Sequence, residues 1–247
     1  MAHSPDWNRA PEPGPQRQAA PEVRAPTTPE KYDCIVLAAG LSSRMGTNKL
    51  LLPVDGVPMV RRVVATAGKV CRRVVVVLGH EAEQVRIAAS SATAAPIEFT
   101  KNENYRSGMF SSIQQGMRSV VSPWFFVLPG DLPFLGASVF RRLVSALSGE
   151  TADAYGGLEG GVGADGDAAD TVTRKPERLP VAAIPTYQGT RGHPVLFSAR
   201  LVPAVVALPP DAGPMRSVLA KHKTVFVELG SPGILRDVDT AEDYRGL

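Results

Sequence analysis

The sequence has little of several features that define common classes of protein. It contains two cysteines in 247 residues, too few for a disulfide scaffold. Cys34 and Cys71 have neither a zinc-ligand nor a CxxC spacing, so we expect buried free thiols. The N-terminus lacks the apolar stretch of a secretory signal, and no hydrophobic run is long enough to span a membrane. These absences predict a soluble, cytoplasmic protein with no membrane partner.

An excess of one charge is also missing. The 27 Lys and Arg residues against 24 Asp and Glu residues leave a net charge of only +3, and the cations form no run. Nucleic-acid-binding proteins usually gather their cations on one face or along one helix, so the composition argues against a nucleic-acid partner. The length and the 44% hydrophobic content suit one α/β domain that buries a core of its own.

Two stretches are poor in large apolar side chains. Residues 1–30 are rich in Pro, Ala and Gln, and such a segment cannot bury enough surface to offset the entropy lost on ordering. We expect these residues to form a disordered tail and residues 31–247 to form the folded domain. Residues 156–179 are rich in Gly, Asp and Ala; of the two interpretations, a lid or a disordered segment, the composition favours a flexible insertion.

Short runs of β-branched or aromatic residues alternate with amphipathic stretches. Continuous apolar runs are typical of strands in a sheet that is covered on both faces. The predicted strands are 34–37, 74–78, 125–128, 181–184, 195–197 and 224–229, with a weak strand at 233–235. The predicted helices are 60–70, 82–89, 111–120, 138–147 and 241–245. This alternation predicts a three-layer α/β/α fold with a mostly parallel sheet, in which ligands bind outside the carboxyl ends of the strands.

A loop of small residues follows the first predicted strand, and residues 37–49 read LAAGLSSRMGTNK. Small side chains let the backbone approach a ligand, and consecutive N–H groups in such a loop can form an anion-binding nest. Arg44 and Lys49 add two cations of the kind that bind phosphate. The alternative is an ordinary β–α turn with two surface cations, since the string is neither a Walker A loop nor a GxGxxG fingerprint.

An aspartate follows the third predicted strand. Asp131 ends a tight Pro-Gly-Asp exit at the expected carboxyl edge of the sheet, where a hard carboxylate suits Mg²⁺ and its phosphate ligands. The alternative is that Asp131 caps the following helix. The small-residue loop expected nearby favours metal binding.

A second acidic site lies near residue 240. Asp237 and Asp239 are two residues apart on a segment expected to be extended, so both side chains would face one way and could share a cation. The alternative is turn and cap chemistry before the helix at 241–245, where Thr240 is a good N-cap. From the residues alone, both interpretations stay open.

The string at 37–49 resembles the signature loop of the MobA-like nucleotidyltransferases, LxAGxSxRMGxxK. The matching residues are Leu37, Ala39, Gly40, Ser42, Arg44, Met45, Gly46 and Lys49. The resemblance continues in family order at 102–109, 130–133, 192–195 and 237–244. Within the family the string is most similar to that of molybdenum cofactor cytidylyltransferases, which attach CMP to molybdopterin. The resemblance implies a Rossmann-like nucleotidyltransferase fold.

The resemblance also implies roles for individual residues. Arg44, Lys49 and Asp131 are implied as catalytic residues, and Asp131 and Asp239 as the carboxylates that hold Mg²⁺, with Mn²⁺ as a substitute. The residues implied to bind the nucleotide are Leu37, Ala38, Ala39, Gly40, Gly79, Asn102, Gly108, Ser112 and His193.

Two of these residues have a second interpretation. Ser112 opens the predicted helix 111–120, so its hydroxyl could serve as a helix cap. His193 lies between Gly192 and Pro194, and its side chain could contact the acceptor substrate or hydrogen-bond within the turn.

The implied reaction is transfer of CMP from CTP to the phosphate of molybdopterin, with release of pyrophosphate. In the family, Ala at the position of Ala39 goes with CTP and Gly goes with GTP, which agrees with an Ala methyl filling space that a purine needs. The alternatives are GTP with molybdopterin, a sugar phosphate or alcohol phosphate as acceptor, and a non-catalytic nucleotide-binding protein. A molybdoenzyme or its maturation chaperone is the implied protein partner.

Overall fold

The computed structural model describes residues 32–42, 45–155 and 179–246. The expected tail at 1–30 and the expected insertion at 156–179, apart from its last residue, lie outside these ranges. The strands are β1 (Asp33–Ala38), β2 (Pro53–Val54), β3 (Val57–Pro58), β4 (Arg73–Leu78), β5 (Ile97–Lys101), β6 (Trp124–Pro129), β7 (Ala182–Tyr187), β8 (Thr190–Arg191), β9 (Val195–Ser198) and β10 (Thr224–Glu228). The α-helices are α1 (Met59–Gly68), α2 (Ala82–Ala89), α3 (Met109–Met117), α4 (Ala137–Tyr155), α5 (Val202–Val206), α6 (Met215–Leu219) and α7 (Ala241–Arg245).

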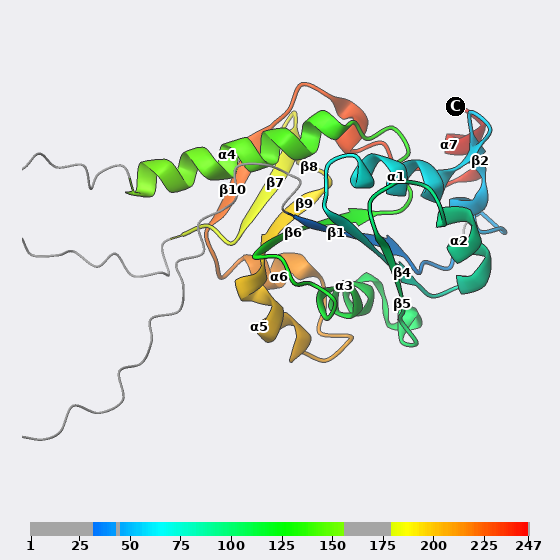
Figure 1. Ribbon diagram of the computed structural model, residues 1–247, viewed down its shortest axis with the longest axis horizontal. Coiled ribbons are helices and arrows are strands. Elements are labelled where there is room, and N and C mark those ends of the chain that lie inside the picture. The colour runs from blue at the N-terminus through cyan, green and yellow to red at the C-terminus, as the bar shows by residue number, and fades with distance from the viewer. Residues whose placement is uncertain (1–31, 43–44, 156–178, 247) are drawn as a thin grey trace, which may run out of the picture.

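One large sheet runs through the described residues in the order β10-β7-β9-β6-β1-β4-β5, with β8 paired to β7 (Figure 1). The pairs β10–β7, β6–β1, β1–β4 and β4–β5 are parallel, whereas β9 runs antiparallel to both of its neighbours. The prediction of a mostly parallel sheet is confirmed. A separate antiparallel pair, β2 and β3, precedes α1.

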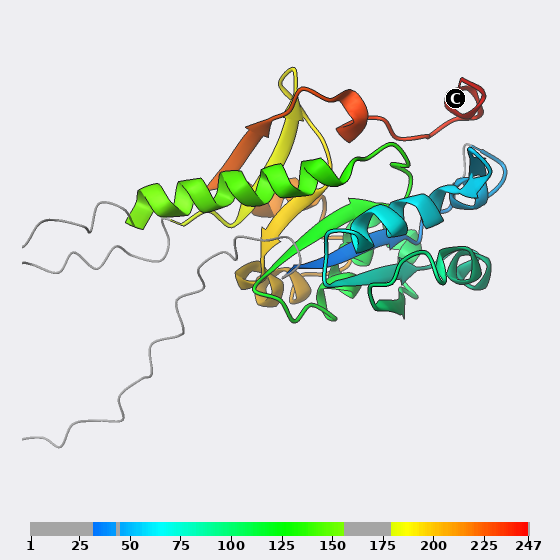
Figure 2. The same cartoon turned by 45° about the horizontal axis from the view of Figure 1, so that its top comes forward.

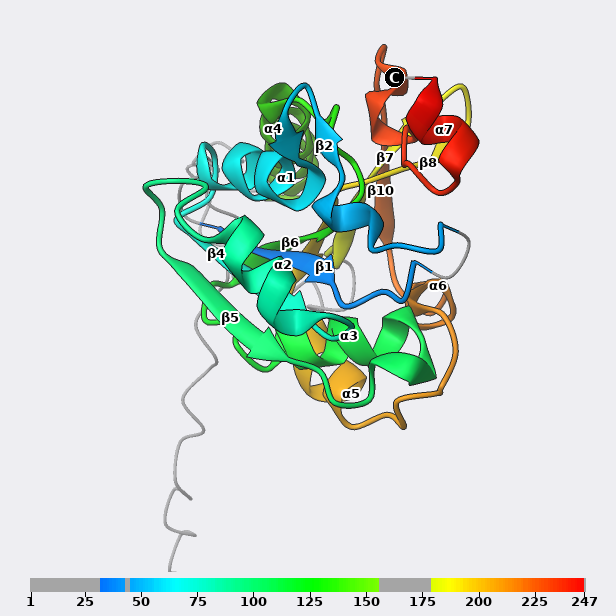
Figure 3. The ribbon, with the colours of Figure 1, turned by 90° about the vertical axis from the view of Figure 1, so that its right-hand side faces the viewer.

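Side chains of β1 alternate between two cores, one on each face of the sheet. Residues 34–37 of this strand are all apolar because each of them enters one of the two cores. Cys34 and Val36 pack with residues of α1, α2 and α4 on one face of the sheet. Ile35 and Leu37 pack with residues of α3 and α5 on the other face. Figure 3 shows α1 and α4 on one side of the sheet and α3 and α5 on the other, and Figure 2 shows α4 lying across the strands. The three-layer prediction is therefore confirmed, and both cysteines are buried free thiols.

Local structure departs from the prediction in three places. The weak strand at 233–235 is wrong, because Pro232–Ile234 form a 3-10 helix, η7, capped by the Ser231 side chain. Strand β5 was not predicted, because its side chains are only partly buried and give no continuous apolar run. Helix α4 starts as predicted but continues to Tyr155. Within the described residues, no helix is both long and apolar enough to cross a membrane.

A buried aspartate ties three segments together at the amino end of the sheet. Asp33 is fully buried and accepts hydrogen bonds from Arg72 (3.1 Å), Arg73 (3.0 Å) and the backbone N–H groups of Val121 (3.0 Å) and Ser122 (3.2 Å). Burial alone would raise the pKa of Asp33, but the N–H donors and the Arg73 guanidinium outweigh it and hold that pKa below its usual value. Asp33 thus joins β1 to the turns before β4 and β6.

We expect Asp33→Asn to lower the free energy of unfolding by about 2 kcal/mol at neutral pH, because hydrogen bonds to a charged group are lost. The folded-state pKa lies below the unfolded value of about 3.9. The stabilisation is therefore complete above that value and is lost as pH falls through the folded-state pKa. Urea unfolding of both proteins at neutral and acidic pH measures this, and the gap between them should close in acid.

The matched control for this prediction is Asp55→Asn. The Asp55 side chain is 78% exposed and pairs with Arg62, and exposed pairs contribute little to stability. Equal losses of stability in both variants would contradict the role assigned to Asp33.

Candidate active site

A pocket of about 400 Å³ lies at the carboxyl edge of the sheet, where β1 and β6 end. Figure 3 shows this edge from the front, with the segment after β1 between α7 and α3. The pocket is lined by Leu37, Ala39, Gly40, Leu41, Ser42, Lys49, Leu50, Tyr105, Arg106, Gly108, Met109, Ser112, Pro129, Asp131 and Asp239. It lies at the edge where ligands of parallel α/β sheets bind.

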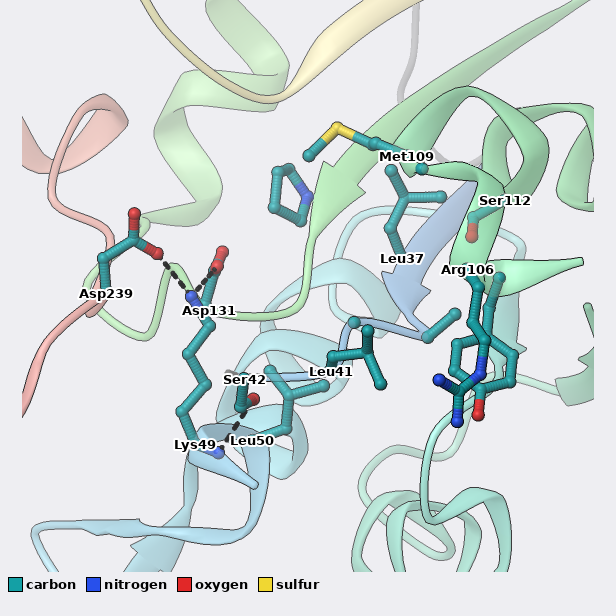
Figure 4. A pocket seen from close by; sticks show the side chains of 15 residues that line it. Leu37, Leu41, Ser42, Lys49, Leu50, Arg106, Met109, Ser112, Asp131 and Asp239 are labelled. Atoms are coloured by element: carbon teal, nitrogen blue, oxygen red, sulfur yellow. Dashed lines mark hydrogen bonds and ion pairs between the residues drawn. The ribbon is translucent and has the colours of Figure 1, made fainter. Parts of the chain in front are cut away.

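The acidic side of this pocket is built around one ammonium group. Lys49 Nζ lies 2.6 Å from Oδ2 of Asp131 and 2.5 Å from Oδ1 of Asp239 (Figure 4). Lys49 begins the 3-10 helix η2 (Lys49–Leu51), Asp131 follows β6, and Asp239 precedes α7. Three residues far apart in the sequence therefore meet at one point.

Backbone hydrogen bonds hold the two acidic segments in place. The N–H of Gly130 donates to the carbonyl of Leu37 (2.9 Å), which ties the exit of β6 to the end of β1. The N–H of Val238 donates to the carbonyl of Asp131 (3.2 Å). The Val238 side chain is buried against Val54 of β2. The segment that carries Asp239 is therefore fastened both to the sheet and to the β2–β3 pair.

Among the described residues, three carboxylates lie close to the Lys49 ammonium at the acidic side of the pocket. The pKa of Asp237 is raised, first by partial burial and then by the charges of Asp239 and Asp131. Burial disfavours the charged form of Lys49, but Asp131 and Asp239 outweigh burial and hold the pKa of the Lys49 amine above its usual value. Within the described part of the chain, Asp131, Asp237 and Asp239 therefore form an acidic group around Lys49.

The oxygen atoms of this side fit a hard divalent cation. Oδ1 of Asp131 is buried and has no hydrogen-bond partner among the described residues, so its lone pairs remain for a ligand. Mg²⁺ and Mn²⁺ favour carboxylate oxygens, and Mg²⁺ usually takes one or two of them and completes its shell with water and substrate phosphates. The described residues include no group of three or more His, Cys, Asp and Glu side chains that could hold a metal. A cation held by Asp131 and Asp239 would depend on its substrate for other ligands.

The loop after β1 folds back through its own hydrogen bonds. The N–H of Lys49 donates to Oγ of Ser42 (3.1 Å), and the buried Asn48 caps η2 by accepting from the N–H of Leu50 (3.2 Å). These bonds fix the direction in which the Lys49 side chain leaves the loop. Arg44 lies outside the described residues, so its contact with phosphate stays a prediction.

The residues expected at the nucleotide fall into two groups. Those that line the pocket are Leu37, Ala39, Gly40, Gly108 and Ser112. Those that do not line it are Ala38, Gly79, Asn102 and His193. The Ala38 side chain lies in the core that faces α1, Gly79 and Asn102 position residues of the pocket wall, and His193 lies near Asp131.

Asn102 organises the start of α3. Its buried amide donates to Oγ of Ser111 (2.8 Å) and of Ser112 (3.0 Å), and its carbonyl accepts from the N–H of Asn104 (3.0 Å). Because α3 begins at Met109, Ser112 lies inside the helix, and the alternative that it caps the helix is wrong. Asn102 therefore holds the Ser112 hydroxyl at the wall of the pocket.

Gly79 lets the chain approach itself closely. A Cβ at this position would lie 2.7 Å from both Cβ and the carbonyl oxygen of Ala39, and 2.8 Å from Cβ of Tyr105. The next N–H, of His80, donates to the same carbonyl (3.3 Å). Gly79 thus sets where Ala39 and Tyr105 stand in the pocket wall.

His193 lies close enough to the acidic side to respond to its charge. Burial lowers the pKa of the imidazole, while the charge of Asp131 and a hydrogen bond to the backbone of Val127 oppose this shift. Nδ1 of its ring has no hydrogen-bond partner among the described residues, and the backbone N–H of His193 donates to the carbonyl of Ile234 (3.1 Å). Burial thus holds the pKa of His193 below its usual value, and one ring nitrogen has no partner within the described part of the chain.

The lining residues that were not predicted individually include Leu41, Leu50, Tyr105, Arg106 and Met109. Tyr105 and Arg106 follow the unpredicted strand β5 and lie within the segment 102–109 that resembles the family, where only Asn102 and Gly108 were assigned to the nucleotide. The sequence did contain a signal for Tyr105 and Arg106, because an aromatic residue stands directly before a cation between two polar segments.

A mostly parallel sheet with helices on both faces and a pocket at its carboxyl edge defines the Rossmann-like nucleotide-binding class. The model of the MobA-like NTP transferase domain matches residues 34–225. The chain belongs to this family and is a nucleotidyltransferase.

Individual relatives agree with this membership. The molybdenum cofactor cytidylyltransferase of Escherichia coli strain K12 is 26% identical over 212 residues, which cover 86% of this chain and 93% of that protein. The structure is similar to that of Rv0371c from Mycobacterium tuberculosis H37Rv, with a TM-score of 0.63, 21% identity, and coverage of 87% of this chain and 96% of that one. A complex of Rv0371c with manganese gives a TM-score of 0.60 at 20% identity, covering 87% and 97%. Molybdopterin-guanine dinucleotide biosynthesis protein A from Archaeoglobus fulgidus gives 0.58 at 15% identity, covering 87% and 95%.

We expect Gly79→Ala to displace Ala39, because the new Cβ meets a backbone oxygen that cannot turn away. Forcing an extra carbon into a packed site typically costs about 1–3 kcal/mol. Urea unfolding should show this loss, and nucleotide affinity should fall with it. The control is Gly230→Ala, whose Cβ meets no heavy atom within 4 Å. Equal stability of the two variants would contradict the steric role of Gly79.

Proposed function

We propose that this nucleotidyltransferase transfers CMP from CTP to the terminal phosphate of molybdopterin and releases pyrophosphate. The observation that carries the proposal is the convergence of Lys49, Asp131 and Asp239 beside the small-residue loop after β1. The cytidylyltransferase of Escherichia coli, which matches over 86% of the chain, supports the choice of CTP and of this acceptor.

The chemistry asks mainly for charge neutralisation. An oxygen of the acceptor phosphate forms a bond to the α-phosphorus of CTP, and the bond from that phosphorus to the β-phosphate oxygen breaks, so that pyrophosphate leaves with the electron pair. The acceptor is already anionic, so no side chain has to remove a proton. The obstacle is repulsion between two anions, and positioned cations lower it.

Each residue then has a distinct task. Asp131 and Asp239 would hold Mg²⁺ or Mn²⁺, and that cation would supply charge neutralisation at the α- and β-phosphates. Lys49 and Arg44 would bind the phosphate oxygens. The backbone of Ala39 and Gly40 would lie along the triphosphate, since small side chains leave it accessible.

Ala39 is the proposed reason for the choice of cytosine. Its methyl group stands in the pocket wall and is backed by Gly79, so it cannot retreat from a bulky base. One methyl typically changes discrimination by about 10- to 200-fold. The molybdoenzyme or chaperone that would receive the product stays a prediction of the family resemblance.

Pyrophosphate release with purified protein tests the proposed function directly. CTP, GTP, UTP and ATP are each supplied with molybdopterin and Mg²⁺ or Mn²⁺, and parallel reactions contain a sugar phosphate or an alcohol phosphate instead. We expect release only with a divalent cation and fastest with CTP and molybdopterin. Release that is faster with another acceptor would overturn the molybdopterin assignment, and no release with any pair would overturn the transfer activity.

We expect Asp131→Asn to reduce turnover by a factor of about a thousand or more, because loss of a metal carboxylate removes several kcal/mol of transition-state stabilisation. Asp237→Asn is the matched control, since it removes a charge from the same side without removing a proposed ligand, and it should reduce turnover less than about tenfold. Mn²⁺-induced change in melting temperature gives a second measurement. Turnover of Asp131→Asn within tenfold of wild type at saturating Mg²⁺ would sink the assignment.

We expect Ala39→Gly to raise the use of GTP relative to CTP, because removal of the methyl group opens space for a purine. The ratio of kcat/KM values for the two nucleotides is the quantity to measure, since Gly also loosens the loop and can slow both reactions. The ratio should shift by roughly 10- to 200-fold. An unchanged ratio would mean that Ala39 does not select the base.

A further inference from the structure

Arg106 is an exposed cation of the pocket that the proposed reaction leaves unused. It lies on the 3-10 helix η3 (Tyr105–Ser107), and its guanidinium carbon stands 5.5 Å from the centre of the Tyr105 ring. No carboxylate in the described part of the chain lies within ion-pairing distance of Arg106, whereas Arg62, Arg72, Arg73 and Arg86 all pair with carboxylates. Its N–H donors therefore remain for a ligand.

The backbone that carries Arg106 is held firmly. The N–H of Ser107 donates to the carbonyl of Asn104 (2.9 Å), and the N–H of Gly108 donates to the carbonyl of Tyr105 (3.3 Å). Tyr105 packs against the core of α3, and its ring lies 6.4 Å from that of His80. An arginine on a fixed turn, with its guanidinium over an aromatic ring, is pre-organised to donate in one direction.

The two ends of the pocket differ in chemistry. Figure 4 shows Arg106 on the opposite side of the pocket from Asp131 and Asp239. The mouth near Arg106 carries the exposed apolar side chains of Leu41 (41% exposed) and Met109 (59% exposed). Since the acidic end would hold the cation and the phosphates, the nucleoside must extend toward the apolar end. Flat apolar contacts beside a few fixed donors suit a heteroaromatic base.

We propose that Arg106 recognises the base by donating two hydrogen bonds to adjacent acceptor atoms on one edge. This inference rests on the proposed nucleotide-transfer function. Cytosine offers O2 beside N3, and guanine offers O6 beside N7, the pair that arginine binds bidentately in nucleic acids. Adenine and uracil place an N–H donor next to the acceptor, which leaves one arginine donor facing another donor. Arg106 therefore separates cytosine and guanine from adenine and uracil, and Ala39 separates cytosine from guanine.

Equilibrium binding of CTP, GTP, ATP, UTP and inorganic tripolyphosphate, each with Mn²⁺, tests this inference. We expect Arg106→Ala to weaken CTP binding by roughly tenfold to a hundredfold, the range for one bidentate pair. Affinities for tripolyphosphate and ATP should change by less than about threefold, as neither ligand makes the pair. Arg106→Lys should not restore CTP affinity, because an ammonium is a single point of charge. Arg118→Ala is the control, since Arg118 is exposed on the far end of α3 and hydrogen-bonds Gln115.

The outcomes separate the inference from the function on which it rests. Equal weakening of CTP and tripolyphosphate would make Arg106 a phosphate contact and overturn base recognition, as would unchanged CTP affinity in Arg106→Ala. A wild-type protein that binds CTP but releases no pyrophosphate would refute the transfer activity, and the Arg106 comparison would still decide base recognition. A wild-type protein that binds none of these ligands would overturn both.

Discussion

Two carboxylates repel each other, and among the described residues the ammonium of Lys49 lies between Asp131 and Asp239 and offsets that repulsion. Lys49 provides that cation, and its position is fixed by the hydrogen bonds of the loop after β1. The same contact explains why the site lies where β1 and β6 end side by side. Breaking any one of these connections would leave like charges together in a partly buried place, which is costly.

The pocket combines this acidic end with an end where apolar side chains lie beside one cation, Arg106. Its middle is made of main chain and small side chains, and their positions are set from behind by Gly79 and Asn102. Neither of these two residues lines the pocket. The shape of the site therefore depends on residues behind the pocket wall as much as on residues that line the pocket. Both kinds occur close together in the sequence, since Asn102 lies behind the wall and Gly108 and Ser112 line it.

The sequence predicted the central strands well, because a strand buried on both faces needs a continuous apolar run, and β1, β4 and β6 have one after the charged residues Asp33 and Arg73 that begin β1 and β4. Strand β5 was not predicted, because it lies at one edge of the sheet and its partly buried side chains form no continuous apolar run. The segment of η7 was predicted as a strand because Gly-Ile-Leu is apolar, whereas the Ser and Pro that start the turn come just before it. Lys49, Asp131 and Asp239 were predicted to serve one site and lie together. Gly79 and Asn102 were assigned to the ligand, yet their neighbours are parts of the same chain. A sequence shows that a residue must be small or polar, but not which atoms fill the space beside it.

The tie between Val238 and Asp131 also has a consequence for how the protein matures during synthesis. Chains emerge from the ribosome with their N-terminal part first and can fold as they emerge. Strands β1 to β6 can then assemble while residue 239 is still untranslated, and at that stage Lys49 and Asp131 form a pair of equal and opposite charge. Only when the later segment docks does the second carboxylate, that of Asp239, join this pair. If Asp131 and Asp239 hold the divalent cation as proposed, a partly synthesised chain has only one of the two ligands, and metal binding is one of the last events in its folding.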